Sequence, residues 1–273
     1  MKLTSTVHTH SVFCDGQNTP AEMAAAAAAA GFATFGLSGH SYVAAEAFGL
    51  APDKLARYRA EAARLRRGYA GRMEVLCGLE QDSESEPARR QDFDYLIGSV
   101  HAVRGPDGRP WVVDDTPARL AQGIADGFGG DAEALACAYC EQVADFALAL
   151  RPEIVGHFDL VRKFNAGNRF FDENGPRFCA AAAAALDRVL GAGLVLEVNT
   201  GGISRGWRTD PYPSEFLLRR VLAAGGRVTV TDDAHTAAAL GFGFDAALAL
   251  LTRVGFAEVW QLTGAGWQAV PLR

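Results

Sequence analysis

The six histidines are the residues of this chain whose types and positions point most clearly to chemistry. Each follows a short β-branched or apolar run, whereas histidines used as filler would be scattered without regard to such runs. Imidazole is the commonest ligand for borderline transition metals, and parallel α/β folds carry their chemistry at the carboxyl ends of strands. The pattern predicts a metal-dependent enzyme that uses His8, His10, His40, His101, His157 and His235.

His8-Thr9-His10 is the most specific local signal. Residues two apart on a strand face the same side, so both imidazoles can reach one ion. Taken alone, the pair could equally share a polar barrel interior. The other histidine motifs, all at predicted strand ends, favour the metal-binding interpretation.

Strand and helix signals alternate along almost the whole chain, which is typical of a parallel sheet with crossover helices. Thr19-Pro20 with Glu22 predicts the start of one helix, and Asp172-Glu173 the start of another. Residues 105–130 are expected to be irregular. Strands are predicted at 3–7, 34–38, 74–79, 95–100, 154–155, 194–198, 228–231 and 256–260, and helices at 24–30, 52–67, 131–150, 172–190, 213–224 and 243–251. This makes seven to eight β/α units, the number of a barrel.

The composition favours one α/β domain over residues 1–273. The histidine motifs run from residue 8 to residue 235, so a division of the chain would divide the site. The 26 Lys and Arg against 32 Asp and Glu give a formal charge of −6 without a basic tract. Phosphate backbones need clustered positive charge, so we expect no nucleic-acid partner.

Cysteine usage and the N-terminus indicate a reduced, cytoplasmic protein. Five irregularly spaced cysteines do not form a disulfide framework, and Cys137 and Cys140 are expected to pack within a helix rather than bind zinc. No apolar stretch follows Lys2, so no signal peptide is expected. The uncharged run 23–45 is broken by glycines and changes from helix to strand, which argues against a membrane span.

Beyond the histidines, several longer stretches carry a resemblance that extends over residues 5–240. These are HTHSVFCDGQNTP, FGLSGHS, GLEQD, DYLIGSVHAV, FGGD, VGHFDLVRKF, LEVNTGGISRG, PYPS and VTDDAH. The chain is similar in them to the polymerase and histidinol phosphatase (PHP) family, and within it to the monofunctional histidinol-phosphate phosphatases. The resemblance implies a distorted (β/α)7 barrel with three metal ions at its C-terminal face.

The resemblance also implies the ligand of each ion and the catalytic groups. Glu80, Asp233 and His235 are the residues that it places in catalysis. One ion would be bound by His8, His10, Glu80 and Asp233, a second by Glu80, His101 and His157, and a third by Asp15, His40 and His235. Asp15 could instead be an ordinary turn residue before Gly16, where many relatives have a histidine.

Such a ligand set would make a positive pocket in an otherwise acidic protein, suited to a phosphate ester. Mixed nitrogen and oxygen ligands suit Zn, Mn or Fe. The ions would activate water for attack on phosphorus, so no side-chain nucleophile is needed. Arg162 and Arg205, in loops after predicted strands, are the expected phosphate ligands, unless they are solvated surface arginines.

The remaining candidates have alternatives that the sequence leaves open. Asn199 could serve the site or close a turn through its side chain. Cys14 is close to His10 in sequence, but a small apolar loop residue is the favoured interpretation. Asp82, Asp114 and Asp115 could contact a cationic substrate or be ordinary surface charges.

The function that the resemblance implies is hydrolysis of L-histidinol phosphate to L-histidinol and inorganic phosphate, in histidine biosynthesis. A PHP phosphoesterase for another small phosphate ester or a nucleotide is the first alternative. A polymerase-associated PHP module, nuclease or structural, is the second, and the acidic charge argues against it. The oligomeric state cannot be read from the sequence.

Overall fold

The computed structural model describes residues 2–272, and its central element is a seven-stranded sheet in the order β1-β2-β3-β4-β7-β8-β9. Neighbouring strands pair in parallel throughout. A parallel bridge between Thr9 and Ala234 joins the two outer strands beyond their carboxyl ends, so the sheet forms a nearly closed barrel. The predicted (β/α)7 barrel is therefore confirmed. Its strands are β1 (Ser5–Thr6), β2 (Thr34–Leu37), β3 (Glu74–Asp82), β4 (Tyr95–Ser99), β7 (Ile154–Val155), β8 (Val195–Asn199) and β9 (Arg227–Thr231).

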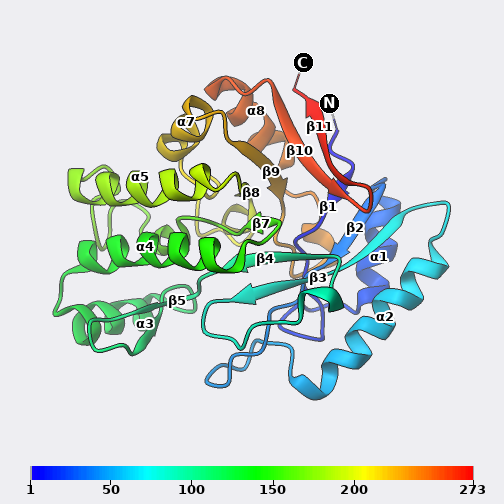
Figure 1. Cartoon of the computed structure of the whole chain (residues 1–273), viewed down its shortest axis with the longest axis horizontal. Helices are drawn as coiled ribbons and strands as arrows, with labels where there is room; N and C mark the ends of the chain where they lie inside the picture. Colours follow the sequence, from blue (N-terminus) through cyan, green and yellow to red (C-terminus); the bar gives the residue numbers. More distant parts are fainter. Residues whose placement is uncertain (1, 273) are drawn as a thin grey trace.

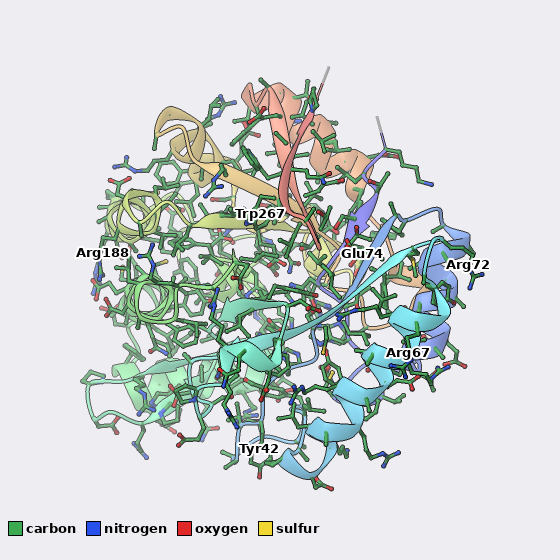
Figure 2. The ribbon with its side chains drawn as sticks, turned by 45° about the vertical axis from the view of Figure 1, so that its right-hand side comes forward. Tyr42, Arg67, Arg72, Glu74, Arg188 and Trp267 are labelled. Carbon is green, nitrogen blue, oxygen red and sulfur yellow. The ribbon has the colours of Figure 1, made fainter. Side chains whose placement is uncertain are left out.

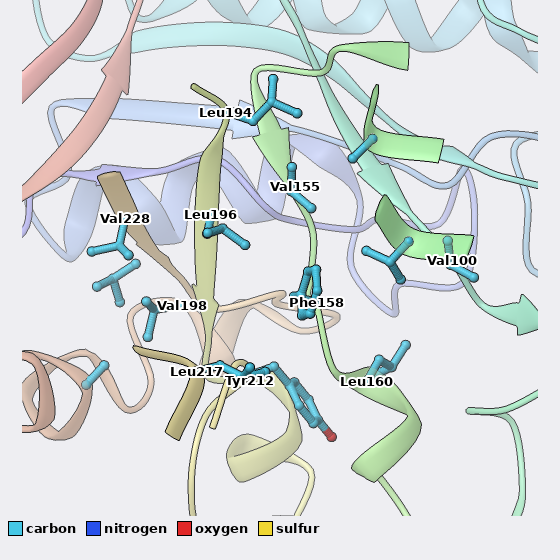
Figure 3. Packing of buried hydrophobic residues seen from close by; sticks show 14 of the residues in the cluster. Val100, Val155, Phe158, Leu160, Leu194, Leu196, Val198, Tyr212, Leu217 and Val228 are labelled. Atoms are coloured by element: carbon cyan, nitrogen blue, oxygen red, sulfur yellow. The ribbon is translucent and has the colours of Figure 1, made fainter. Parts of the chain in front are cut away.

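Helices cover the outside of the barrel (Figure 1). They are α1 (Pro20–Ala29), α2 (Leu55–Gly68), α4 (Ala132–Leu150), α5 (Pro176–Gly191), α7 (Glu215–Ala223) and α8 (Phe244–Val254). Thr19 and Glu22 form the predicted capping box of α1. Outward-facing strand residues such as Val155, Leu196 and Val198 fill the layer beneath the helices (Figure 3). This burial of apolar area is what holds the helices against the barrel.

The barrel interior has two different ends. Apolar side chains fill the end where the strands begin, among them Val7, Tyr95, Ile97 and Ile154. A hairpin of β10 (Glu258–Thr263) and β11 (Gly266–Pro271) closes this end, with Leu262 inserted into the same cluster. The carboxyl ends of the strands are left for polar residues.

The hairpin corrects the predicted last β/α unit, because the strand expected at 256–260 lies outside the barrel sheet and pairs in antiparallel fashion. Ser5 Oγ donates to the Leu262 carbonyl at 2.7 Å, and Glu74 Oε2 accepts from the Gly264 N–H at 2.7 Å. Glu74 and Trp267 are labelled in Figure 2. These contacts attach the hairpin to the first residues of two barrel strands.

Two further predictions are wrong in detail. Residues 105–130 are not irregular throughout: β6 (Pro110–Val112) forms a hairpin with β5 (Ala102–Arg104), which precedes this range, and α3 (Pro117–Gln122) continues into a π-helical turn. Asp172-Glu173 does not cap α5, which follows Gly175 without a side-chain cap among the described residues. Glu173 instead binds arginines, as described below.

The window Ala237–Val254 has the length and hydropathy of a membrane span. In the structure it contains a short 3-10 turn (Ala237–Ala239), two glycines with positive φ, and the 11-residue helix α8. Leu250, Leu251 and Val254 of α8 are buried in the protein core. The apolar composition of this window is thus accounted for by packing.

Candidate metal centre

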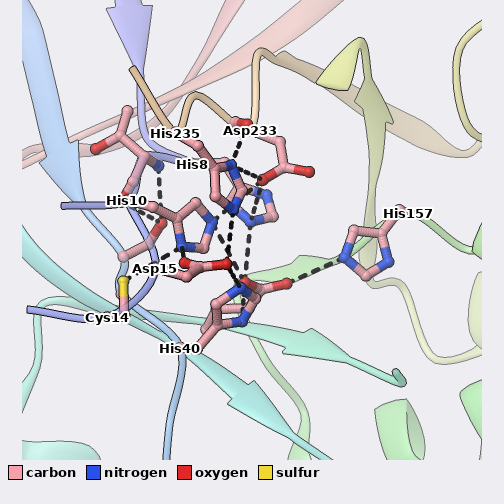
Figure 4. A network of polar contacts seen from close by, with 12 residues as sticks. His8, His10, Cys14, Asp15, His40, His157, Asp233 and His235 are labelled. Atoms are coloured by element: carbon pink, nitrogen blue, oxygen red, sulfur yellow. Dashed lines mark hydrogen bonds and ion pairs between the residues drawn. The ribbon is translucent and has the colours of Figure 1, made fainter. Parts of the chain in front are cut away.

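Nine side chains converge at the carboxyl ends of the barrel strands (Figure 4). The short strands and tight turns bring them together from positions as far apart as residues 8 and 235. They are the six histidines with Asp15, Glu80 and Asp233, and their separations run from 2.8 to 3.6 Å for the pairs described below. These are all the metal-binding candidates of the sequence, and the fold places every one of them in a single cluster.

Glu80 lies at the centre of the cluster. It is fully buried near the end of β3, which continues to Asp82 and so extends further than the sequence predicts. Its carboxylate contacts five imidazoles: His40 Nδ1 at 2.8 Å, His157 Nε2 at 3.0 Å, His8 Nε2 at 3.3 Å, and His10 Nε2 and His101 Nε2 at 3.5 Å. A carboxylate in this position can bridge two ions.

Asp233 follows β9 and contacts the first histidine pair. Its Oδ1 lies 3.1 Å from His10 Nε2 and 3.6 Å from His8 Nε2. Asp233 has a φ of 48°, a left-handed conformation that a non-glycine residue adopts at a cost. Strain of this kind is typical of functional sites, and here it turns the carboxylate toward the histidines.

Asp15 lies in the loop after β1, at the outer side of the cluster. Its Oδ2 is 3.2 Å from His235 Nε2 and 3.6 Å from His40 Nε2. The next residue is necessarily small, because a Cβ on Gly16 would lie 2.4 Å from the backbone nitrogen of Ser11. Position 16 therefore cannot hold a histidine in this tight turn, and the turn directs Asp15 toward the cluster instead.

Three groups of side chains bring ligand atoms close enough to share an ion: His8, His10 and Asp233; His40, Glu80 and His101; and His10, Asp15, His40 and His235. They agree with the implied ligand sets in most residues. There are three differences. Glu80 is not in the group of His8, His10 and Asp233, His40 rather than His157 completes the group around His101, and His10 joins the group of Asp15, His40 and His235. His157 still reaches Glu80 from the other side.

The chemistry of these atoms fits divalent cations. His8 Nε2, His10 Nε2, His40 Nδ1 and Glu80 Oε2 are buried and have no hydrogen-bond partner within residues 2–272. His40 Nδ1 and Glu80 Oε2 approach to 2.8 Å without the alignment of a hydrogen bond. Buried polar atoms are normally satisfied, so several converging lone pairs without donors indicate an ion between them.

The pKa values of the histidines depend on burial and on the neighbouring charged groups of the cluster. Burial lowers the pKa of His10 to about 3, helped by two neighbouring imidazoles, which leaves it neutral and able to coordinate. Burial opposes charge on His8 too, but Glu197 and Glu80 outweigh it and raise its pKa well above the ordinary value. Glu80 has the same effect on His40. The cluster therefore stabilises positive charge, whether carried by protons or by metal cations.

The carboxylates remain ionised for the complementary reason. Burial would raise the pKa of Glu80, yet the surrounding imidazoles hold it well below its ordinary value. Burial is likewise outweighed at Asp233, chiefly by Arg205, whose guanidinium lies 2.8 Å from Oδ2. Both groups are thus anionic ligands at neutral pH.

A cavity of about 520 Å³ opens onto the cluster. Glu80, Asp233 and His235 line it, so these three predicted catalytic residues face the space where a ligand would bind. Its size is within the range of small-molecule sites. Phe48 covers part of the cluster, with its ring 4.9 Å from that of His40.

Three cations line the cavity, and only Arg205 was predicted. Arg119 is paired with Glu46 at 2.7 Å, which leaves Arg205 and Lys163 as the cations to consider. Arg205 contacts Asp233, and its Nε is buried without a partner among the described residues. Lys163, which the sequence analysis missed, lines the same cavity and lies 3.5 Å from Asp114. The motif VRKF contained the signal, since a second cation follows Arg162 directly.

Arg162 has a different place from the predicted one. Its side chain is buried in ion pairs with Asp159 at 3.0 Å, Glu173 at 2.7 Å and Asp210 at 2.5 Å, and it is not among the described residues that line the cavity. All three guanidinium nitrogens are used by these carboxylates. The structure therefore does not support a direct phosphate contact by Arg162.

Other candidates are resolved by their contacts. Asn199 closes a turn, as its Oδ1 accepts from the Gly201 N–H at 2.8 Å. Cys14 Sγ lies 3.6 Å from His10 Nδ1 but belongs to none of the three groups. Asp82 is buried against His101, whereas Asp114 and Asp115 line the cavity.

Two buried carboxylates, Glu197 and Asp82, lie behind the cluster and contact its histidines. Glu197 contacts His8 Nδ1, and Asp82 Oδ2 lies 2.7 Å from His101 Nδ1. Sequence reasoning missed Glu197, although a carboxylate in the apolar run 194–198 was a signal of a buried polar partner.

Cys137 and Cys140 lie within α4, with Cys140 fully buried.

Comparison with known proteins agrees with this geometry. The PHP domain model matches residues 6–201. A "probable histidinol-phosphatase" of Deinococcus radiodurans is 31% identical over 264 residues, which cover 91% of this chain and 92% of that protein. The barrel with a histidine-rich metal centre thus defines a class, and the chain belongs to the PHP family.

Two solved structures share the fold. The hisK protein of Listeria monocytogenes superposes with a TM-score of 0.76 at 20% identity, over 89% of this chain and 99% of that one. The histidinol phosphate phosphatase of Lactococcus lactis, solved with Zn, L-histidinol and phosphate, superposes with a TM-score of 0.67 at 21% identity, over 98% and 100%.

Proposed function

We propose that the chain is a histidinol-phosphatase, a phosphoric monoester hydrolase that releases inorganic phosphate from L-histidinol phosphate in histidine biosynthesis. The observation that carries the reaction class is the set of six imidazoles and three carboxylates at the floor of one cavity. The substrate is supported by the family and by the Deinococcus relative, which matches over nine-tenths of both chains.

We propose further that the centre holds three divalent ions. The ligand sets implied by the resemblance would hold them, with Glu80 shared between the set of His8 and His10 and the set of His101 and His157, all of which its carboxylate contacts. The donor set suits Zn, Mn or Fe. Zinc is the ion bound by the Lactococcus lactis protein. When bound, such ions lower the pKa of a coordinated water and offset negative charge on a phosphoryl group.

The chain's own cations would hold the substrate phosphate. Arg205 faces the cavity beside Asp233 and His235, and Lys163 approaches from the loop after β7. A guanidinium offers phosphate two parallel donors, while an ammonium acts as a point charge. Asp233, Glu80 and His235 are the catalytic residues of this proposal, because they line the cavity as well as contributing ligand atoms.

The rest of the cavity suits the cationic part of the substrate. Asp114 and Asp115 supply negative charge to the cavity wall, and Phe48 and Leu160 supply apolar surface. L-Histidinol phosphate carries an ammonium group and an imidazole beside its phosphate. We expect the carboxylates to face the ammonium group and the apolar side chains to contact the imidazole ring.

A cytoplasmic location and the lack of a nucleic-acid partner remain predictions from composition and charge. The substrate test is hydrolysis of a panel of phosphate monoesters by protein reconstituted with Zn or Mn. L-Histidinol phosphate should have the highest kcat/KM. Preference for another ester or a nucleotide would retain the metal-dependent phosphatase but contradict the substrate, and salt-dependent DNA binding with nuclease activity would contradict both.

A further inference from the structure

Glu197 is a fully buried carboxylate that the proposed function does not use. It lies on β8 between Leu196 and Val198, which face the helix layer (Figure 3). Because alternate strand residues face opposite sides, Glu197 points into the barrel, toward the floor of the metal centre. It belongs to none of the three ligand groups among the described residues.

Its two oxygens are fully engaged. Oε1 contacts His8 Nδ1 and accepts from Thr231 Oγ1 at 2.6 Å. Oε2 accepts from the His157 N–H at 2.6 Å and from Asn199 Nδ2 at 3.0 Å. One side chain thereby connects the segment after β1, the loop after β7, β8 and β9, and two of its partners, His8 and His157, are proposed ligands.

The contact with His8 has a consequence for coordination. An imidazole that donates its Nδ1 proton to a carboxylate keeps a lone pair on Nε2. His8 Nε2 is the atom that faces Glu80 at 3.3 Å and Asp233 at 3.6 Å, and it is buried without a hydrogen-bond partner in the part of the chain that the structure describes. Glu197 thus turns the coordinating nitrogen toward the centre.

We propose that Glu197 is a positioning residue, which fixes the tautomer and ring orientation of His8 and so sets the affinity of the ion held by His8, His10 and Asp233. The inference rests on the proposed metal-dependent function. A carboxylate behind a ligating histidine also makes that histidine a stronger ligand, and loss of such a partner typically weakens metal binding by about 10- to 100-fold.

Asp82 provides a matched control, because it contacts the Nδ1 of a different histidine. Its Oδ2 lies 2.7 Å from His101 Nδ1, and His101 belongs to the group with His40 and Glu80. Glu197→Gln and Asp82→Asn make the same chemical change behind two different groups. A general loss of structure would weaken metal binding at all sites together. A positioning role predicts that each variant weakens metal binding at one site, and that this site differs between the two variants.

The experiment compares cadmium-substituted wild type, Glu197→Gln and Asp82→Asn by cadmium NMR and by equilibrium competition with a chelator. Each variant should weaken one ion by about 10- to 100-fold, with a different resonance affected in each. Equal loss of affinity for all ions, or wild-type affinity in Glu197→Gln, would overturn this inference and leave the proposed function standing. A wild type that binds no ion would overturn the proposed function with it.

A second measurement does not depend on how well Glu197→Gln folds. Nitrogen NMR of histidine-labelled, zinc-loaded wild type should show His8 protonated at Nδ1, with a proton in slow exchange because the contact is fully buried. His8 protonated at Nε2, or coordinated through Nδ1, would contradict the positioning role directly.

Discussion

Replacement of Arg205 by alanine tests the phosphate-binding side of the cavity. Arg205 Nη2 lies 2.8 Å from Asp233 Oδ2, and Nη1 lies 3.1 Å from both the Asp233 carbonyl and His235 Nδ1. The guanidinium is therefore held beside the centre, in a residue that lines the cavity. We expect Arg205→Ala to impair catalysis while the barrel stays folded.

The magnitude follows from the loss of one charge-assisted hydrogen bond. Such a bond contributes about 1.5–3 kcal/mol, which corresponds to a fall in kcat/KM of roughly 10- to 150-fold. The assay is steady-state hydrolysis of L-histidinol phosphate, with inorganic phosphate as competitive inhibitor. Phosphate should inhibit the variant less strongly, because product and substrate share the contact.

Arg162→Ala is the matched control, since it removes an arginine that is buried away from the cavity. Breaking a buried ion pair costs about 3–5 kcal/mol, which for a chain of this size lowers Tm on the order of 10 °C. The two variants should thus separate, with Arg205→Ala losing mainly kcat/KM and Arg162→Ala losing mainly Tm. Unchanged kcat/KM and phosphate inhibition in a metal-loaded Arg205→Ala protein would refute this reasoning.

Three further predictions concern the ions and Lys163. Glu80→Gln should lower kcat/KM by roughly a hundredfold or more, and by more than Asp15→Asn does, because Glu80 contacts five imidazoles. Metal analysis should show two ions bound more weakly in Glu80→Gln and one ion bound more weakly in Asp15→Asn. Ion binding, measured by calorimetry, should weaken as the pH falls, beginning above the ordinary pKa of histidine, because the raised pKa values of His8 and His40 let protons compete for the ligand nitrogens. An affinity independent of pH would contradict this. Lys163→Ala should lower kcat/KM about tenfold while Lys163→Arg retains most of it, and equal activity in both would place Lys163 outside phosphate binding.

The barrel and its histidines could be predicted because their signals are local. Short apolar runs followed by polar residues mark strand ends, and the carboxyl ends of parallel strands meet at one face. His8 and His235 are distant in sequence, yet closure of the barrel between Thr9 and Ala234 brings them to one centre. The start of α1 was predictable for the same reason, as Thr19 and Glu22 interact within one turn.

What the sequence did not reveal depends on contacts between distant segments. Arg162 follows His157 by five residues, but its carboxylate partners include Asp210, 48 residues further on. The strand at 256–260 has the same local pattern as a barrel strand, and only its antiparallel partner β11 separates it from the barrel. The role of Glu197 could not be predicted without knowing which face of β8 points into the barrel.

In the proposed function, these nine side chains form a trinuclear centre that hydrolyses L-histidinol phosphate. The most direct test is a titration of the metal-free protein with Zn or Mn, following bound metal and phosphate release together. Activity should be absent without metal and reach its plateau at three ions per chain. Full activity after exhaustive chelation, or a plateau at a single ion, would contradict the account.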